Sequence, residues 1–271
     1  ALVVGAALGL GGAQMQTLLD NPLASPFTLG IATAAGFGAA LALVVNNLFG
    51  LESLLSIPVG AFFFSMLAAS MLFGLALMRH VNSQTIILAG IALLFLFQSL
   101  LSLLQFVSSP ELNQQIVFWL FGSLMRTTWD SLTITFVITL VCSLLLYRDA
   151  WKLTCLRLGE ARARSLGVNI NALRIKTLVL VALMTATAIS FVGIIGFIGL
   201  VAPHIGRMLI GEDQRFLIPL SALCGAAMLS MSSVISKSIV PGALFPIGIV
   251  TAIIGVPFFI WLILGRGRKH A

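Results

Sequence analysis

The chain has 271 residues, of which 59% are hydrophobic and only 8% are charged, and its mean hydropathy is +1.12. Soluble globular domains carry about 25% charged residues, so this composition excludes a water-soluble protein and predicts an all-α polytopic membrane protein. The formal net charge of +7 would also suit a nucleic-acid-binding protein, but the positions of the basic residues argue against that function.

Nine apolar segments follow one another along the chain, and we expect each to cross the bilayer as a helix. They lie at about residues 1–19, 28–45, 54–78, 84–106, 131–147, 173–192, 194–210, 216–236 and 246–264. Each is close to the length that spans a hydrocarbon layer of about 30 Å. Residues 1–271 are therefore expected to form a single transmembrane domain.

The chain opens with Ala1 inside an apolar run, without an initiator Met or a basic flank. A signal peptide would begin with a charged region and end at a small-residue cleavage site. We therefore expect an N-terminal truncation that removed one upstream helix. The native protein would then have ten helices and both of its ends in the cytoplasm.

Residues 107–130 interrupt the series of apolar segments. They contain Pro110, Glu111 and Arg126 but also the apolar stretch 116–125, which is too short to cross the membrane and return. We predict a half-helix that lies at the external surface and helps to shape a vestibule.

The basic residues are distributed unequally between the two sides of the predicted membrane. Thirteen of the fifteen fall in alternate loops: Arg79, Arg148, Lys152, Arg157, Arg162, Arg164, Arg174, Lys176, Arg207, Arg215, Arg266, Arg268 and Lys269. Only Arg126 and Lys237 are left for the opposite side. Because basic residues favour cytoplasmic loops, loop 148–174 and the C-terminus are expected in the cytoplasm, and Glu52 and Lys237 outside. This bias explains the charge without a nucleic-acid partner.

Small residues are spaced so that helices can approach one another closely. Gly5, Gly9, Gly11 and Gly12 cluster near the start, with intervals of four from Gly5 to Gly9 and three from Gly9 to Gly12, and Gly193, Gly196 and Gly199 are three residues apart. Such spacing places small residues on one helix face, which favours tight helix packing in a membrane. The three cysteines are scattered singly, without the spacing typical of a metal or redox site.

The sequence contains no motif that would supply the energy for transport. None of its four lysines stands in the GxxxxGK[ST] pattern of a phosphate-binding loop. Its eight acidic residues lie at span ends or in loops, whereas ion-coupled carriers usually bury acidic residues in the middle of a span. We therefore expect a transport subunit that is not itself an enzyme and that depends on a separate ATPase.

The pattern of residues 157–166 predicts a short amphipathic helix. Glu160 precedes Arg164 by four residues, an arrangement that stabilises helices, and Leu158, Ala161 and Ser165 share the opposite face. Gly167 is expected to end this helix, and either Asn169 or Asn171 to cap the next one. Such a helix could dock on an ATPase, although a solvated basic loop would show a similar pattern.

One apolar segment carries a polar face. Gln98, Ser102 and Gln105 recur at helical spacing within 84–106, so this face should turn away from lipid. Both hydrogen bonds between helices and the lining of a transport pathway would account for it. The lone His204 follows Pro203 in an apolar segment, and we interpret it as a packed residue rather than a metal ligand.

Several long motifs resemble the permeases of the iron-siderophore, haem and cobalamin ABC importers, the FecCD-type family. They are GAQMQTLLDNPLASPFTLGI at 12–31, FWLFGSL at 118–124, GEARARSLGV at 159–168, GIIGFIGLVAPHIGRMLIGEDQRFLIPLSALCGA at 193–226 and PIGIVTAIIGVPFFIWLI at 246–263. The resemblance implies the ten-helix fold of these permeases. It also implies a second permease copy or paralogue, two ATP-binding ABC subunits, and a periplasmic or lipid-anchored substrate-binding protein.

The resemblance also assigns roles to particular residues. The family's ATPase-coupling element matches Gly159, Glu160, Ala161, Arg162, Ser165, Leu166 and Gly167. Lys237 occupies a position at which the family carries a cation that docks the binding protein. Two positions depart from the family pattern: Ser232 or Ser233 replaces an Asp, and Leu244-Phe245 replaces a Glu-Leu pair. A second docking Arg of the family would lie upstream of Ala1.

These features together predict a multi-pass permease of the bacterial plasma membrane that imports a ferric siderophore by alternating access. Haem and cobalamin are the alternative substrates within the same class. The helix corresponding to 84–106 lines the pathway in this family, which favours the pathway interpretation of Gln98, Ser102 and Gln105. An ion-coupled secondary carrier is the competing hypothesis from another class. No cofactor and no metal site is expected in this chain.

Overall fold

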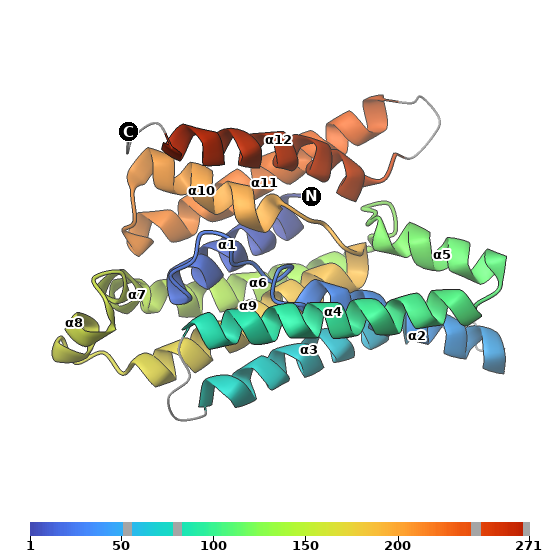
Figure 1. Cartoon of the computed structure of the whole chain (residues 1–271). Helices are drawn as coiled ribbons and strands as arrows, with labels where there is room; N and C mark the ends of the chain where they lie inside the picture. Colours follow the sequence, from blue (N-terminus) through green and yellow to red (C-terminus); the bar gives the residue numbers. More distant parts are fainter. Residues whose placement is uncertain (51–55, 78–82, 240–244, 268–271) are drawn as a thin grey trace.

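The computed structural model (Figure 1) describes residues 1–50, 56–77, 83–239 and 245–267. In this part of the chain the secondary structure consists of α-helices, as the composition predicts. The helices are α1 (Leu2–Leu18), α2 (Ile31–Phe49), α3 (Ser56–Leu77), α4 (Ser83–Val107), α5 (Pro110–Leu120), α6 (Trp129–Arg148), α7 (Ala150–Leu156), α8 (Glu160–Ser165), α9 (Ile170–Val192), α10 (Ile198–Ile210), α11 (Gln214–Ser238) and α12 (Ile247–Gly267). Glu52, Arg79, Leu244, Arg268 and Lys269 lie outside the described residues.

Nine of these helices correspond to the nine predicted spans. Among the described residues, α2, α3, α4, α6, α9 and α11 are long and apolar enough to cross a membrane, and α1, α10 and residues 247–260 of α12 form shorter apolar helices. The prediction of an all-α polytopic membrane protein is therefore confirmed. The predicted half-helix within 107–130 is found as α5, where Ser109 caps the N-terminus by accepting a hydrogen bond from the Leu112 N–H at 3.3 Å.

The boundary of one predicted span is wrong. We expected a helix over 194–210, but residues 193–197 are not helical and α10 begins only at Ile198. Gly193 ends α9 with a positive φ of 79°, and the Val192 carbonyl accepts a hydrogen bond from Ser123 N–H at 2.7 Å instead of continuing the helix. Phe197, which precedes α10, also has a positive φ of 65°.

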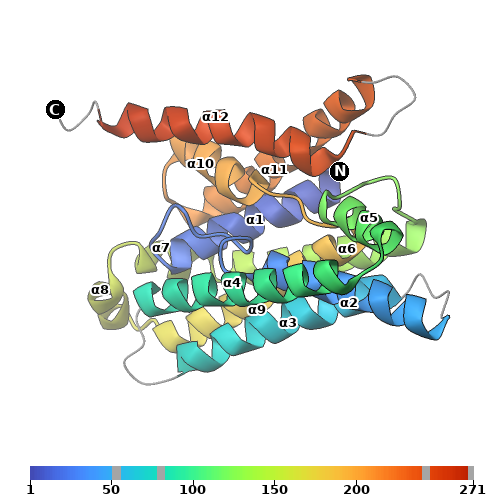
Figure 2. The same ribbon diagram turned by 45° about the vertical axis from the view of Figure 1, so that its right-hand side comes forward.

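The helices define two ends of the molecule. Figure 1 shows α7 and α8 together at one end, which we call the α8 end, and α5 at the other, which we call the α5 end. Helix α1 runs between a group formed by α10, α11 and α12 and a second group that contains α2, α3, α4, α6 and α9, as Figure 2 also shows. It contacts α9, α10 and α11, and almost all of its residues are buried. The core is therefore centred on α1.

Glycines bring α1 into backbone contact with its neighbours. A Cβ added to Gly5 would stand 2.3 Å from the Gly225 carbonyl oxygen of α11, and one added to Gly12 would stand 1.8 Å from the Gly199 carbonyl oxygen of α10. Side chains as small as a methyl group are therefore excluded at these crossings. The glycine spacing predicted this close packing for Gly5, Gly12 and Gly199, whereas Gly193 lies outside the helices.

The surface of α6 has the character of a lipid-facing helix. Its exposed side chains include Phe136, Leu140 and Leu144. Trp129 is 82% exposed at one end of the helix, and Tyr147 is exposed at the other. Aromatic residues at both ends of an apolar helix are typical of the two membrane interfaces.

Candidate functional site

The connection between α6 and α9 contains two short helices in place of the single helix predicted for 157–166. Helix α7 ends at Leu156 and α8 begins at Glu160. Between them Gly159 adopts φ 99° and ψ 150°, a conformation that is essentially restricted to glycine. The chain therefore turns at Gly159, and the apolar Leu158 falls outside α8.

The predicted end of α8 at Gly167 is confirmed. Gly167 has a φ of 81°; its N–H donates to the Arg164 carbonyl at 2.9 Å and the Val168 N–H to the Ala163 carbonyl at 3.1 Å. This pair of bonds defines a Schellman motif, and the buried Val168 and Ala163 provide its apolar contact. Asn169, one of the two proposed caps, accepts a hydrogen bond from the Ala172 N–H at 3.1 Å and starts α9.

The residues assigned to the coupling element fall into two groups. Six of them are exposed: Gly159, Ala161, Arg162, Ser165, Leu166 and Gly167. Glu160 is only partly exposed, because its carboxylate accepts hydrogen bonds from Arg174 at 2.7 Å and from Arg164 at 3.1 Å. Arg174 lies in the first turns of α9 and is 4% exposed. Glu160 therefore anchors α8 to α9, and the exposed residues form the free surface.

Asp149 gives α7 a similar attachment to α9. Its carboxylate receives one hydrogen bond from Lys152 in α7, at 2.7 Å, and one from Lys176 in α9. Burial raises the pKa of the Asp149 carboxyl, but the two lysines outweigh this effect and leave the pKa below its ordinary value. The carboxylate is therefore charged at neutral pH and fixes the start of the connection.

The predicted polar face of α4 is present but lies apart from the coupling element. Gln98 and Ser102 are exposed and Gln105 is partly exposed, whereas Phe97 and Leu101 on the other face are buried. Helix α4 contacts α2 and α3. The side that carries the polar residues is thus turned away from the rest of this chain.

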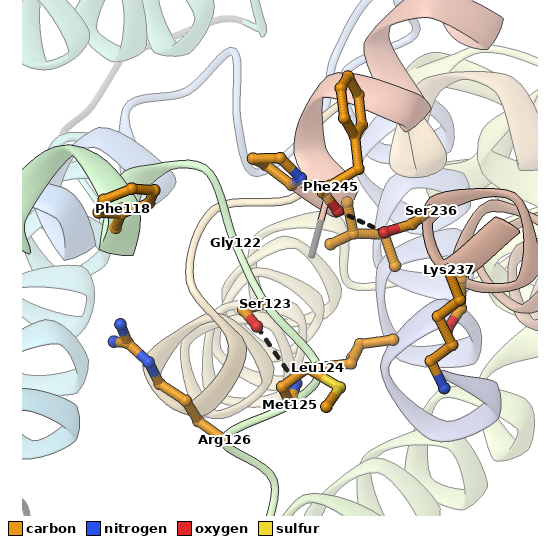
Figure 3. Close-up of a pocket in the computed structure, with 12 residues that line it drawn as sticks. Phe118, Gly122, Ser123, Leu124, Met125, Arg126, Ser236, Lys237 and Phe245 are labelled. Carbon is orange, nitrogen blue, oxygen red and sulfur yellow. Dashed lines mark hydrogen bonds between the residues drawn. The ribbon is translucent and has the colours of Figure 1, made fainter. Parts of the chain in front are cut away.

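A pocket of about 340 Å³ opens at the α5 end between the α5–α6 connection and the facing ends of α11 and α12 (Figure 3). It is lined by Phe118, Gly122, Ser123, Leu124, Met125, Arg126, Ser233, Ser236, Lys237, Phe245, Pro246 and Ile247. The Ser236 hydroxyl donates a hydrogen bond to the Phe245 carbonyl and joins α11 to the segment that precedes α12. These lining residues include two cations and no acidic side chain.

The fold brings the two basic residues of this end to one pocket. Arg126 and Lys237 flank it from opposite sides (Figure 3), although they are far apart in the sequence. Sequence reasoning placed both on the same side of the membrane but considered only Lys237 as a docking residue. Of the two candidate positions for the Asp of the resembling family, Ser233 lines the pocket and Ser232 is buried.

A bundle of apolar helices with a structured, exposed connection at one end and a pocket at the other defines a multi-pass membrane permease. The sequence model of the FecCD transport family matches residues 1–265. The chain therefore belongs to the FecCD transport family, and it is a permease subunit of an ABC importer. The family implies separate ATP-binding subunits and a partner permease.

Individual relatives match the chain over nearly its full length. The hemin transport system permease protein HmuU of Yersinia pestis is 38% identical over 100% of this chain and 81% of its own length. The molybdate import system permease protein MolB of Haemophilus influenzae is 36% identical over 96% of this chain and 76% of its own length. A solved ABC transporter, described as of the metal-chelate type and inward-facing, has a TM-score of 0.89 at 35% identity, covering 97% of this chain and 83% of that chain.

Proposed function

We propose that this permease imports a metal chelate, with a ferric siderophore as the leading candidate and haem or cobalamin as alternatives. The observation that carries the proposal is the similarity over nearly the whole chain to a hemin permease and to a metal-chelate type transporter. The similarity to a molybdate permease adds an oxyanion to the cargoes that must be compared. The expected location is the plasma membrane of a bacterium.

A binding assay on the cognate substrate-binding protein tests the substrate. The purified binding protein is titrated with a ferric siderophore, haem, cobalamin and molybdate in parallel. The proposal predicts that the ferric siderophore binds most tightly and that its uptake requires ATP and this permease. Preference for another of the four would reassign the cargo, and uptake that persists without ATP but depends on a proton gradient would contradict the importer mechanism.

The mechanism we propose is alternating access driven by the ATP-binding subunits. The exposed residues of α8 supply a surface for such a partner, and Glu160 and Asp149 hold that surface on α9. The polar face of α4, formed by Gln98, Ser102 and Gln105, is proposed to line the pathway together with the second permease. This arrangement accounts for polar side chains on a helix face that its own chain leaves uncovered.

The first prediction concerns orientation. The described basic residues cluster at the α8 end, and only Arg126 and Lys237 lie at the α5 end, which favours a cytoplasmic α8 end. A cysteine at 237 should react with a membrane-impermeant maleimide in intact cells, and one at 162 only after permeabilisation. The three native cysteines, of which Cys142 and Cys155 are buried and Cys224 is partly exposed, set the labelling background in the parent protein. The reverse labelling pattern would invert the topology.

The second prediction concerns docking of the binding protein at the pocket. We expect Lys237→Glu and Arg126→Glu each to weaken binding of the binding protein to the permease in detergent, and the double variant to weaken it further. An exposed ion pair contributes about 0.2–1 kcal/mol, whereas removing one partner of a buried interfacial pair costs about 2–5 kcal/mol. Because the pocket is only partly shielded from water, the binding free energy lost in each variant should lie between these two ranges. The loss should grow at low salt, where charges are less screened.

Arg148→Glu is the matched control for this experiment, since Arg148 is an exposed cation at the opposite end. A lysine that only anchors a helix end in the membrane interface would leave docking unchanged when reversed in charge. If Lys237→Glu binds the substrate-binding protein with unchanged affinity at low salt, Lys237 only anchors the helix end and does not take part in docking.

A further inference from the structure

One arginine joins three separate connections at the α8 end. Arg157 lies between α7 and α8, and its guanidinium donates to Asp20, which follows α1, and to Glu212, which lies between α10 and α11, the latter at 3.1 Å. Its side chain is only 27% exposed. A planar guanidinium holds its donors in a rigid fork and can donate to two carboxylates from fixed positions, whereas the three donors of a lysine ammonium rotate. Arg157 therefore links the α7–α8 element to α1 and to α10.

The contacts continue from Glu212 into α10. The second oxygen of Glu212 accepts a hydrogen bond from Arg207 Nε at 3.1 Å, and Arg207 lies in the last turn of α10 with its side chain 11% exposed. Arg207 also donates to Gln16 in α1. One carboxylate oxygen of Glu212 therefore accepts from Arg157 of the α7–α8 connection, and the other accepts from Arg207 of α10.

A second set of contacts holds α7 against α11 by a different route. The Gln214 N–H donates to the Thr154 hydroxyl of α7 at 3.0 Å, and its buried side chain donates to Thr17 of α1 at 3.0 Å. The Gln214 side chain also donates to the Glu212 carbonyl at 3.2 Å, so this attachment reaches the backbone of the turn that follows α10. The ion pairs of Glu212 are the side-chain contacts that join Arg157 to Arg207 of α10.

Helix α10 has the form of an element that can move as a unit. Its 13 residues span only about 20 Å, less than a bilayer, and the non-helical residues 193–197 separate it from α9. Phe197 at its start has a φ of 65°, an uncommon conformation for a residue other than glycine. Large φ/ψ changes in domain motions are absorbed at a few element-terminal residues of this kind.

We propose that Arg157 is a positioning residue that transmits the displacement of α7 and α8 to α10 through Glu212 and Arg207. This inference rests on the proposed docking of α8 on the ATP-binding subunit. In this proposal Arg157 does not contact the ATP-binding subunit directly. Loss of Arg157 should therefore leave ATP hydrolysis intact while α10 no longer responds to it.

The experiment uses the complete transporter with its ATP-binding subunits in proteoliposomes. A bimane fluorophore at Met208→Cys reports on α10, where Met208 is exposed, and one at Leu144→Cys on α6 serves as the reference position. With Arg157 intact, we expect ATP and vanadate to shift the emission at 208 and not at 144. In Arg157→Gln the shift at 208 should fall by about fivefold or more, the lower range of coupling between sites, with ATP hydrolysis unchanged.

Glu212→Gln should reproduce this loss, and the double variant should be no worse than either single variant, because both remove the same link. If Arg157→Gln does not fold, Glu212→Gln provides the test in its place. Arg215→Gln is the matched control, since Arg215 pairs at 2.6 Å with Asp213 of its own turn, and it should keep the full shift. A full shift at 208 in Arg157→Gln or Glu212→Gln would overturn the proposal.

The variant Leu166→Asp distinguishes an error in the Arg157 link from an error in the proposed docking of α8. If α8 does not dock on the ATP-binding subunit, Leu166→Asp in α8's exposed surface will leave stimulation of ATP hydrolysis unchanged. If α8 docks as proposed but Arg157 does not transmit its displacement, Leu166→Asp will reduce ATP hydrolysis while Arg157→Gln keeps the emission shift.

Discussion

Replacing Gly12 with alanine is expected to lower the thermal stability of the permease and the yield of folded protein. The new Cβ would stand 1.8 Å from the Gly199 carbonyl oxygen and 2.7 Å from the Gly199 Cα. Both are backbone atoms, so α1 and α10 would have to move apart. Overpacking of this kind costs about 1–3 kcal/mol and occasionally more.

The measurement is the midpoint of thermal unfolding in detergent, followed by size-exclusion chromatography. We expect the midpoint of Gly12→Ala to fall by about 5 °C or more, because a loss of 1 kcal/mol shifts it by roughly 2–4 °C in a protein of this size class. Gly74→Ala is the matched control, since Gly74 lies within α3 and its added Cβ would meet no heavy atom within 4 Å apart from its chain neighbours and the backbone of its own helix. An equal fall in both variants would show that the α1–α10 contact is not responsible.

Replacing Leu166 with aspartate is expected to uncouple the permease from its ATP-binding subunits without unfolding it. Leu166 is 52% exposed at the end of α8, and surface substitutions usually change stability by less than about 0.5 kcal/mol. If Leu166 is a central contact of the interface, its loss costs about 2 kcal/mol or more. That corresponds to about 30-fold in affinity.

Stimulation of ATP hydrolysis and cargo uptake are measured in the reconstituted transporter, with the thermal midpoint as a check on folding. Leu23→Asp provides the control, because Leu23 is 49% exposed in the connection between α1 and α2. It should retain stimulation, whereas Leu166→Asp should lose it at an unchanged midpoint. If the transporter with Leu166→Asp shows normal stimulation of ATP hydrolysis, α8 is not part of the interface with the ATP-binding subunits.

Much of the architecture follows from local patterns in the sequence. The apolar segments predict nine helices, and the structure places helices within a few residues of most of these bounds. Gly167 and Asn169 mark the end of α8 and the start of α9, since both act on backbone groups within a few residues of themselves. The spacing of Gly5 and Gly12 likewise indicates a helix face that permits close contact.

The division of loop 148–174 into α7 and α8 was missed because a helical pattern in side chains does not reveal a single unusual backbone conformation. Leu158 fits the amphipathic pattern of 157–166, but the backbone at Gly159 turns the chain. The contact of Glu160 with an ATP-binding subunit stays a prediction, and the sequence indicates only one of the two ion pairs of Glu160. Its pairing with Arg164 is local and visible in the sequence, whereas its partner Arg174 is brought to it by the fold.

Local sequence patterns are enough to predict the class of the protein and the approximate positions of its helices, because hydrophobicity, capping and glycine spacing act over one or two helical turns. The tertiary structure alone decided which distant side chains meet. It placed Arg126 beside the pocket of Lys237 and set Arg157 between Asp20 and Glu212. Such pairs depend on how whole helices pack, and no short-range pattern records the distance between them.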